Sequence, residues 1–351
     1  MKRIDQILIL CVVVLISAGL ISLFSTDIHR FKLQLLHAVI GLGLMFLSLK
    51  VNWKWLFTQN WFIFGFYGLT IFLLLLTLFS TPIRGVKSWL KIGNFNFQTS
   101  ELAKLSLIFL LASFFTKRHF EASRFKNIFI SFLFLAVPGG LVLLQPDLGT
   151  VLILTGIWGG FLLSSGLKAS RILIGLIVFV LIFTISFVFL LKPYQKSRII
   201  SFLFPYRDPL GASYNVIQSK VAIGSAGFFG KGFRQGTQVQ LGFLPEAQTD
   251  FIFSAIIEEW GIIAGIGLIL TYLALVWRIS RIGLRSFSNQ ERFLCLGAMI
   301  VFSIHFFINV GSSLGLFPVV GTTLPLVSYG GSSLLTNCLL LGIIARLETY
   351  F

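Results

Sequence analysis

The chain is a succession of long apolar runs separated by short polar segments. A helix needs roughly 17–25 apolar residues to cross a bilayer, so the pattern predicts about ten transmembrane helices. The expected spans are residues 7–25, 34–49, 62–80, 101–116, 127–145, 149–166, 170–191, 251–277, 293–313 and 326–345. We therefore expect an all-α polytopic membrane protein whose residues 1–351 form a single transmembrane domain.

The large interruption in this pattern is residues 192–249, between the seventh and eighth predicted spans. This segment is rich in Gly, Gln, Ser, Pro and charged residues, and it is too small for an independent domain. We expect a long extracytoplasmic loop with short helical pieces. Its apolar and glycine-rich part, residues 222–229, is expected to be partly re-entrant.

Composition supports a membrane protein and changes the meaning of the charge. Hydrophobic residues make up 56% of the chain and charged residues 11%, against about 25% charged in soluble domains. A net charge of +16 would suggest nucleic-acid binding in a soluble protein. Here Lys and Arg concentrate in the short loops on one side of the predicted spans, which places both termini in the cytoplasm. We expect no nucleic-acid partner.

Ionisable residues at membrane depth are costly, about 2.5–3.5 kcal/mol each, and are therefore candidates for function. Glu101 and Lys104 open the fourth span on one helix face, as a structural ion pair, a substrate-binding pair or both. Asp250 stands at the mouth of the eighth span, as a helix cap or as a catalytic carboxylate.

Two further segments break the apolar pattern. Gln145, Pro146 and Asp147 form a predicted tight turn in which Asp147 caps the next helix. Residues 318–333 hold two prolines and three glycines. Irregular backbone at membrane depth is tolerated only where it is buried in protein or lines a cavity; the alternative is a plain outer loop. His37 and His305 lie in spans without metal-ligand spacing, which favours interhelical hydrogen bonding.

These polar exceptions also carry a family resemblance. The matching segments are RGVKSWLKIGNFNFQTSELAK at 84–104, QPDLGT at 145–150, RDPLGASYNVIQSKVAIGSAGFFGKGFRQGTQVQLGFLPEAQTDFIFSAIIEEWG at 207–261 and GLFPVVGTTLPLVSYGGSSLLTN at 315–337. With the predicted spans and the long loop after the seventh, the chain resembles the SEDS family (shape, elongation, division and sporulation). The IQSKVAIGSAGFFGKG stretch, the lead-in to FLPE and the short N-terminus are similar to its elongation branch rather than its division branch. One departure is Ala247-Gln248, where the family pattern has a charged residue and His.

The resemblance implies the SEDS fold and a peptidoglycan glycosyltransferase in the bacterial cytoplasmic (inner) membrane, active at its extracytoplasmic face in cell elongation and rod-shape maintenance. Its substrates would be lipid II and undecaprenyl-linked glycan, and its partners a class B penicillin-binding protein (the transpeptidase) and other elongation-complex proteins. Asp250 matches the family's essential aspartate and would be the base in an inverting attack by an acceptor 4-hydroxyl on the lipid-diphosphate-linked donor.

A divalent cation, Mg or Mn, could share the diphosphate charge with basic side chains. The expected substrate-binding residues are Arg84, Lys87, Glu101, Lys104, Arg198, Lys220, Ser328 and Tyr329, and the expected structural residues are Gln145, Pro146, Asp147, Gly330 and Gly331. Buried charge and broken helices fit a flippase for a lipid-linked precursor as well, and a non-catalytic scaffold is the third alternative.

Overall fold

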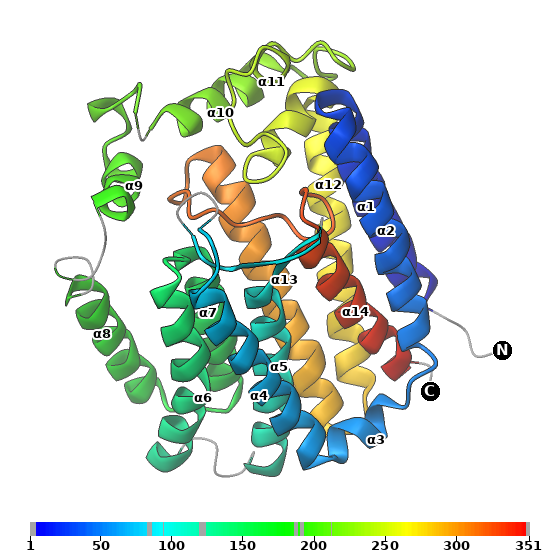
Figure 1. Ribbon diagram of the computed structural model, residues 1–351, viewed down its shortest axis with the longest axis vertical. Helices are drawn as coiled ribbons and strands as arrows, with labels where there is room; N and C mark the ends of the chain where they lie inside the picture. The colour runs from blue at the N-terminus through cyan, green and yellow to red at the C-terminus, as the bar shows by residue number, and fades with distance from the viewer. Residues whose placement is uncertain are drawn as a thin grey trace.

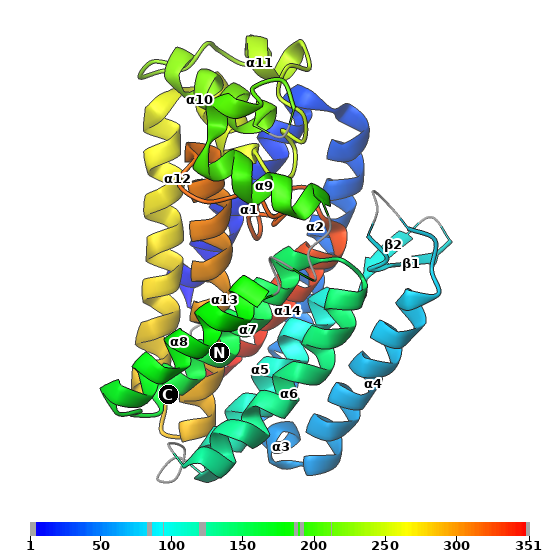
Figure 2. The same cartoon turned by 90° about the vertical axis from the view of Figure 1, so that its left-hand side faces the viewer.

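A computed structural model describes residues 5–82, 86–93, 95–118, 124–185, 189, 193–211 and 213–348. These residues form a bundle of helices (Figure 1) with one small sheet at its side (Figure 2). The helices are α1 Gln6–Thr26, α2 Ile28–Ser48, α3 Trp53–Thr58, α4 Asn60–Leu78, α5 Thr99–Arg118, α6 Phe125–Leu144, α7 Leu148–Ser164, α8 Ala169–Ile185, α9 Pro193–Leu203, α10 Tyr214–Ser225, α11 Thr237–Gln240, α12 Ile252–Arg285, α13 Asn289–Leu314 and α14 Gly331–Glu348. The strands are β1 Trp89–Ile92 and β2 Phe95–Gln98.

Most of the long helices are apolar enough to cross a membrane. Within the described residues, α1, α2, α4, α5, α6, α12 and α13 have the length and composition of spans, and α7 and α14 are shorter apolar helices. Helix α8 covers the first part of the predicted span 170–191, whose remainder falls largely outside the described residues. The last helix begins at Gly331 rather than at residue 326, because residues 326–330 form an irregular segment inside the protein.

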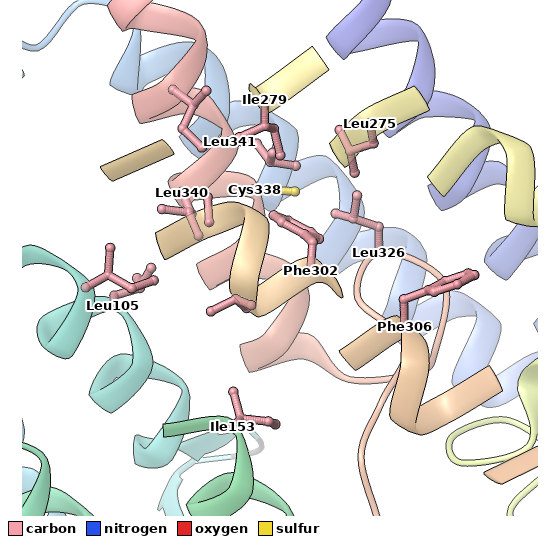
Figure 3. Close-up of a cluster of buried hydrophobic side chains, with 14 of the residues drawn as sticks. Leu105, Ile153, Leu275, Ile279, Phe302, Phe306, Leu326, Cys338, Leu340 and Leu341 are labelled. Atoms are coloured by element: carbon pink, nitrogen blue, oxygen red, sulfur yellow. The ribbon is translucent and has the colours of Figure 1, made fainter. Parts of the chain in front are cut away.

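The centre of the bundle is an apolar core shared by helices that are far apart in the sequence. Helix α5 is buried on nearly every face, against α4, α7 and α13. By contrast, many apolar side chains on α2, α4 and α6 are exposed, as expected for surfaces that face lipid. Figure 3 shows part of the core, which contains Leu105, Ile153, Leu275, Ile279, Phe302, Phe306, Leu326, Cys338, Leu340 and Leu341.

The two ends of the bundle differ. Helices α9, α10 and α11 gather at one end, whereas α1 begins and α14 finishes toward the other (Figures 1 and 2). The sequence predicts a loop with short helical pieces between the seventh and eighth spans, and these helices occupy it. The small β1–β2 hairpin, which pairs Trp89 with Gln98, is an addition that the all-α expectation does not contain. Its strands are only four residues long, and their alternation is lost among the apolar runs.

Helix α12 is broken at Gly261, whose backbone is left-handed with φ at 83°. Residues 227–232 of the long segment insert at the break. The amides of Lys231 and Gly232 donate to the carbonyls of Glu258 and Glu259, at 2.9 and 3.0 Å, and the Ile262 amide donates to the Gly227 carbonyl at 3.1 Å. The inserted backbone thus supplies partners for helical groups that the break would otherwise leave unpaired.

Candidate active site

The segment that joins α13 to α14, residues 315–330, passes through the inside of the protein. The Ser328 hydroxyl donates to the Thr249 carbonyl at 2.7 Å and accepts from the Leu324 amide at 2.9 Å. The Gln34 side chain of α2 donates to the Ser328 carbonyl and accepts from the Gly330 amide, both at 3.2 Å. Ser328 is buried, and its hydrogen bond to Thr249 ties this segment to the residue before Asp250.

A buried asparagine fixes the same junction from α13. Asn309 donates through Nδ2 to the carbonyls of Asp250, at 3.0 Å, and Thr322, at 2.9 Å. Its side chain is 1% exposed. Asn309 was not among the residues singled out from the sequence, although a lone amide in an apolar span is the signal that could have identified it.

Asp250 is half-buried and lies two residues before Ile252, the first residue of α12. A Cβ atom placed on Gly321 would lie 3.8 Å from Asp250 Oδ2 and 3.9 Å from Arg198 Nη1. Gly321 has φ at 75°, a conformation that glycine adopts without strain. The carboxylate and the guanidinium therefore flank a position that is left open by the missing side chain.

Arg198 and Lys220 line one pocket beside this position, together with Gly315, Pro318 and Val319. Arg198, from α9, also donates to the Val319 carbonyl at 3.3 Å. Both cationic side chains are exposed to solvent. The structure therefore brings two of the predicted substrate-binding cations together near Asp250, on elements that are far apart in the sequence.

Glu101 and Lys104 lie elsewhere, in a buried polar network. Lys104 Nζ is 2.8 Å from Glu101 Oε2 and 3.0 Å from His305 Nε2, and Thr336 donates to Glu101 at 3.2 Å. Because an ammonium group only donates, His305 Nε2 must accept, and Nδ1 carries the hydrogen. His305 Nδ1 then donates to the Thr323 carbonyl at 2.9 Å. The ion pair thus supports the backbone two residues from Gly321.

Three other predicted residues lie around the turn between α6 and α7. Gln145 donates to the Leu74 carbonyl at 3.0 Å and to Thr77 at 2.7 Å. Asp147 caps α7 by accepting from the amide and hydroxyl of Thr150, at 3.0 and 2.8 Å, and Pro146 precedes it in the turn. This turn helps to hold the site, since a Cβ on Gly149 would lie 2.7 Å from the Val320 carbonyl oxygen.

Lys87 and Tyr329 do not line the pocket that holds Arg198 and Lys220. Lys87 donates through Nζ to the Leu78 carbonyl at 3.4 Å, and Arg84 lies outside the described residues. The Tyr329 amide donates to the Gln248 carbonyl at 2.9 Å, and its ring lies 5.7 Å from the Arg30 guanidinium.

Gly331, the second glycine after Tyr329, allows α14 to begin close to α2. A Cβ on Gly331 would lie 2.7 Å from the His37 ring. The Gly330 amide is held by Gln34 of α2. A Cβ on Gly330 would make only ordinary contacts, 3.7 Å from Ser333 Cβ and 3.8 Å from Thr323 Cγ2, so the space at this position does not require glycine.

Glu258 and Glu259 hold the long segment to the bundle. Glu258 accepts from Lys231 Nζ and the Gln238 amide, both at 2.8 Å, and from the Val239 amide at 3.1 Å, which caps the start of α11. Glu259 accepts from Gln240 Nε2 at 3.0 Å and also contacts the Ser25 hydroxyl. Both carboxylates are buried, and their bonds account for acidic residues inside α12.

No three His, Cys, Asp or Glu side chains converge on a possible metal position within the described residues. A divalent ion with few protein ligands would share its coordination with substrate phosphates, as Mg²⁺ commonly does.

The fold is that of a known group of membrane proteins. The family model described as a cell cycle protein, which covers FtsW, RodA and SpoVE, matches residues 2–351. The chain belongs to this family, and the SEDS resemblance is confirmed. It is 35% identical to the peptidoglycan glycosyltransferase MrdB of Escherichia coli K12, over 98% of this chain and 93% of that protein.

Other relatives and solved structures also match nearly the whole chain. The chain is 34% identical to the stage V sporulation protein E of Bacillus subtilis, over 99% of this chain and 97% of that protein. A chain of a peptidoglycan synthase complex, solved to explain how polymerization and crosslinking are coordinated, superposes with a TM-score of 0.85 at 32% identity, covering 99% of this chain and 98% of that one. The rod shape determining protein RodA of Thermus thermophilus gives a TM-score of 0.74 at 28% identity, covering 99% and 97%. The predicted fold class, a polytopic helical membrane protein of this family, is confirmed.

Proposed function

We propose that this protein is a peptidoglycan glycosyltransferase that polymerises lipid II into glycan strands. Relatives that match nearly the whole chain have this activity in their names. The observation that carries the proposal is that Asp250 and Arg198 flank the open position at Gly321. Arg198 also lines a pocket together with Lys220. A carboxylate across an open position from one cation, with a second cation in the adjoining pocket, suits a reaction that removes a proton and releases a diphosphate.

In the proposed reaction the acceptor 4-hydroxyl attacks the anomeric carbon of the donor. Asp250 accepts the hydroxyl proton as the new carbon–oxygen bond forms. The bond between the anomeric carbon and the lipid diphosphate breaks, and its electron pair leaves with the diphosphate. Attack from the face opposite the leaving group inverts the anomeric centre.

Arg198 and Lys220 are the proposed partners of the leaving diphosphate. A planar guanidinium can bind phosphate oxygens in a bidentate manner, and an ammonium adds a compact charge. Both side chains are exposed and line one pocket, so they are available to a ligand. Lys104 is instead enclosed by Glu101 and His305, and we propose that it positions the segment around Thr323.

We further propose that the protein lies in the bacterial cytoplasmic membrane with both termini in the cytoplasm. The end of the bundle that carries α9–α11, where α12 begins two residues after Asp250, would then face the site of cell-wall assembly (Figure 1). The similarity to a chain of a peptidoglycan synthase complex supports a transpeptidase partner of the class B penicillin-binding type.

The test is polymerisation of labelled lipid II by the purified protein, with its transpeptidase, in detergent. Replacing a general base typically lowers the rate about 10²–10⁴-fold, so Asp250→Asn should reduce strand synthesis by that amount. A transporter would form no polymer in detergent, where there is no second leaflet. Wild-type protein that makes no glycan strands would therefore contradict the proposed activity.

Asp27→Asn is a matched control. It removes one carboxylate charge near the same end of the bundle, where Asp27 caps α2. Asparagine caps helices as well as aspartate does, so the fold should be retained. Equal losses of activity in the two variants would mean that Asp250 acts through net charge and not as the base.

A further inference from the structure

The segment that enters the break in α12 carries large aromatic side chains on its outside. Phe228 is 71% exposed and Phe229 is 83% exposed. Both follow Gly227, whose φ of 65° turns the chain, and precede Gly230, which packs directly on the backbone of α12. The backbone is therefore fixed while the two rings point away from the protein.

Hydrogen bonds set the level of these rings along the bundle. The Gly227 and Phe228 carbonyls accept from the amides of Ile262 and Ile263. Gly261 lies nine residues after the first residue of α12, which corresponds to about 13 Å along the helix. The segment thus returns from the end of the bundle toward its middle by more than two helical turns.

The same level is where the lipid-facing surface of the bundle begins. Residues 252–259 of α12 are all buried, Trp260 is the first exposed residue, and Ile262 and Ile263 follow as exposed apolar residues. Glu259 contacts Ser25 in the last turn of α1, just before Asp27 starts the polar turn to α2. Phe228 and Phe229 therefore lie where apolar helix surface gives way to polar turns.

A cluster of aromatic rings and one cation marks this level as well. The Phe24 and Phe233 rings are stacked at 5.9 Å, and Phe233 lies 6.1 Å from Trp260. The Arg234 guanidinium lies 5.1 Å from the Phe24 ring and 5.4 Å from the Phe233 ring. Aromatic side chains with an adjacent Arg are typical of the membrane interface, where the cation can meet lipid phosphates.

We propose that residues 227–234 are a re-entrant membrane anchor, with the rings of Phe228 and Phe229 inserted at the boundary between lipid headgroups and acyl chains. The lipid is the occupant because this aromatic surface is continuous with the apolar, exposed face of α12 below it. The anchor holds the long segment, and with it Arg198 and Lys220, at a fixed height above the bilayer. The inference concerns membrane contact and does not depend on the proposed reaction.

The test uses the full chain in lipid nanodiscs of phosphatidylethanolamine and phosphatidylglycerol. Cys11, Cys295 and Cys338 are buried, so Phe229→Cys can be labelled selectively with an environment-sensitive fluorophore. The label should be quenched by nitroxide-bearing lipids with a shallow spin label, and severalfold less by aqueous iodide than a label at Leu210→Cys. Phe228→Cys gives a second, independent position.

Two sites supply the reference values. Leu210 is 87% exposed in the long segment and reports the aqueous phase, and Leu270 is 59% exposed midway along α12 and reports the acyl chains. Iodide quenching at residue 229 equal to that at residue 210 would overturn the proposal. Protection from both iodide and nitroxide lipids would overturn it too, because protein would then cover the ring.

Discussion

At the scale of single residues, a few buried polar side chains determine where Asp250 lies. Asn309 holds the backbone carbonyl of Asp250, and Ser328 holds that of Thr249. Both are surrounded by apolar helices, where a polar group without a partner is costly. Each therefore stabilises one arrangement of the junction, and their removal is expected to affect activity as well as stability.

Asn309→Leu removes both hydrogen bonds that join α13 to the segments around Asp250 and Thr322. Small displacements of reacting groups can lower rates up to about a hundredfold. We expect strand synthesis to fall at least about tenfold, mainly through kcat, in protein that still elutes as a single folded species. Polymerisation kinetics with labelled lipid II measure the effect.

Asn337→Leu is the comparison variant for this experiment. Asn337 is also buried, but its amide donates within its own helix, to the Ser333 carbonyl at 2.7 Å. It should lower stability to a similar degree and leave kcat largely unchanged. Equal kinetic losses in the two variants would show that Asn309 contributes only to folding.

The Glu101–Lys104 pair is nearly inaccessible to solvent, so its members depend on each other. Removing one partner of a buried ion pair typically costs about 3–5 kcal/mol, because the other charge is left uncompensated. Glu101→Gln should lower the free energy of unfolding by that amount, and Glu101→Gln with Lys104→Met should recover much of it. Denaturant unfolding in detergent measures both, and a double variant less stable than the single one would refute the coupling.

At the scale of secondary-structure elements, the main feature is the break in α12. Helix α12 is 34 residues long and consists of two helical pieces that meet at Gly261. The sequence predicts one uninterrupted span in this region. A Cβ at Gly261 would collide with the Phe228 carbonyl and lie 2.5 Å from the Gly230 amide. Only glycine fits, because both the left-handed backbone and the close approach exclude a side chain.

Gly261→Ala should therefore destabilise the protein by about 2 kcal/mol or more, from backbone strain plus the displaced insert. The insert should also become easier to cleave, since its hydrogen bonds to α12 are lost. Thermal unfolding and limited proteolysis within residues 193–249 report the two effects.

Gly267→Ala is the matched control on the same helix. No atom lies within 4 Å of a Cβ at this position, and alanine favours the helix over glycine by up to about 1 kcal/mol. Its melting temperature should stay the same or rise. A fall as large as that of Gly261→Ala would show that the break has no special requirement for glycine.

At the scale of the whole molecule, the proposed orientation rests on the concentration of Lys and Arg in the short loops on one side, and the two unlike ends of the bundle allow it to be tested. Leu210 is exposed at the end with the long segment, and Leu284 is exposed near the last residue of α12 at the other end. A membrane-impermeant maleimide added to intact spheroplasts should label Leu210→Cys and leave Leu284→Cys unmodified until the membrane is permeabilised. The reverse pattern would invert the orientation and place Asp250 on the cytoplasmic side.

Hydropathy predicted much of the architecture, because membrane spans are encoded locally in runs of apolar residues. The family resemblance added the expected role of Asp250. The sequence did not reveal that Arg198 and Lys220 share a pocket, since α9 and α10 meet the 315–330 segment only in the folded bundle. It also left open whether Lys104 is free for substrate, which depends on His305, a residue 201 positions away.

The insertion at Gly261 has a mechanical consequence. Backbone hydrogen bonds join residues 227–232 to both halves of α12. The long segment is therefore not connected to this helix through a flexible loop alone. A pull or push on it is passed to the broken helix, and the first residues of that helix adjoin Asp250. We therefore expect tension applied outside the bilayer to tilt the start of α12, where the reacting sugar is proposed to meet its base.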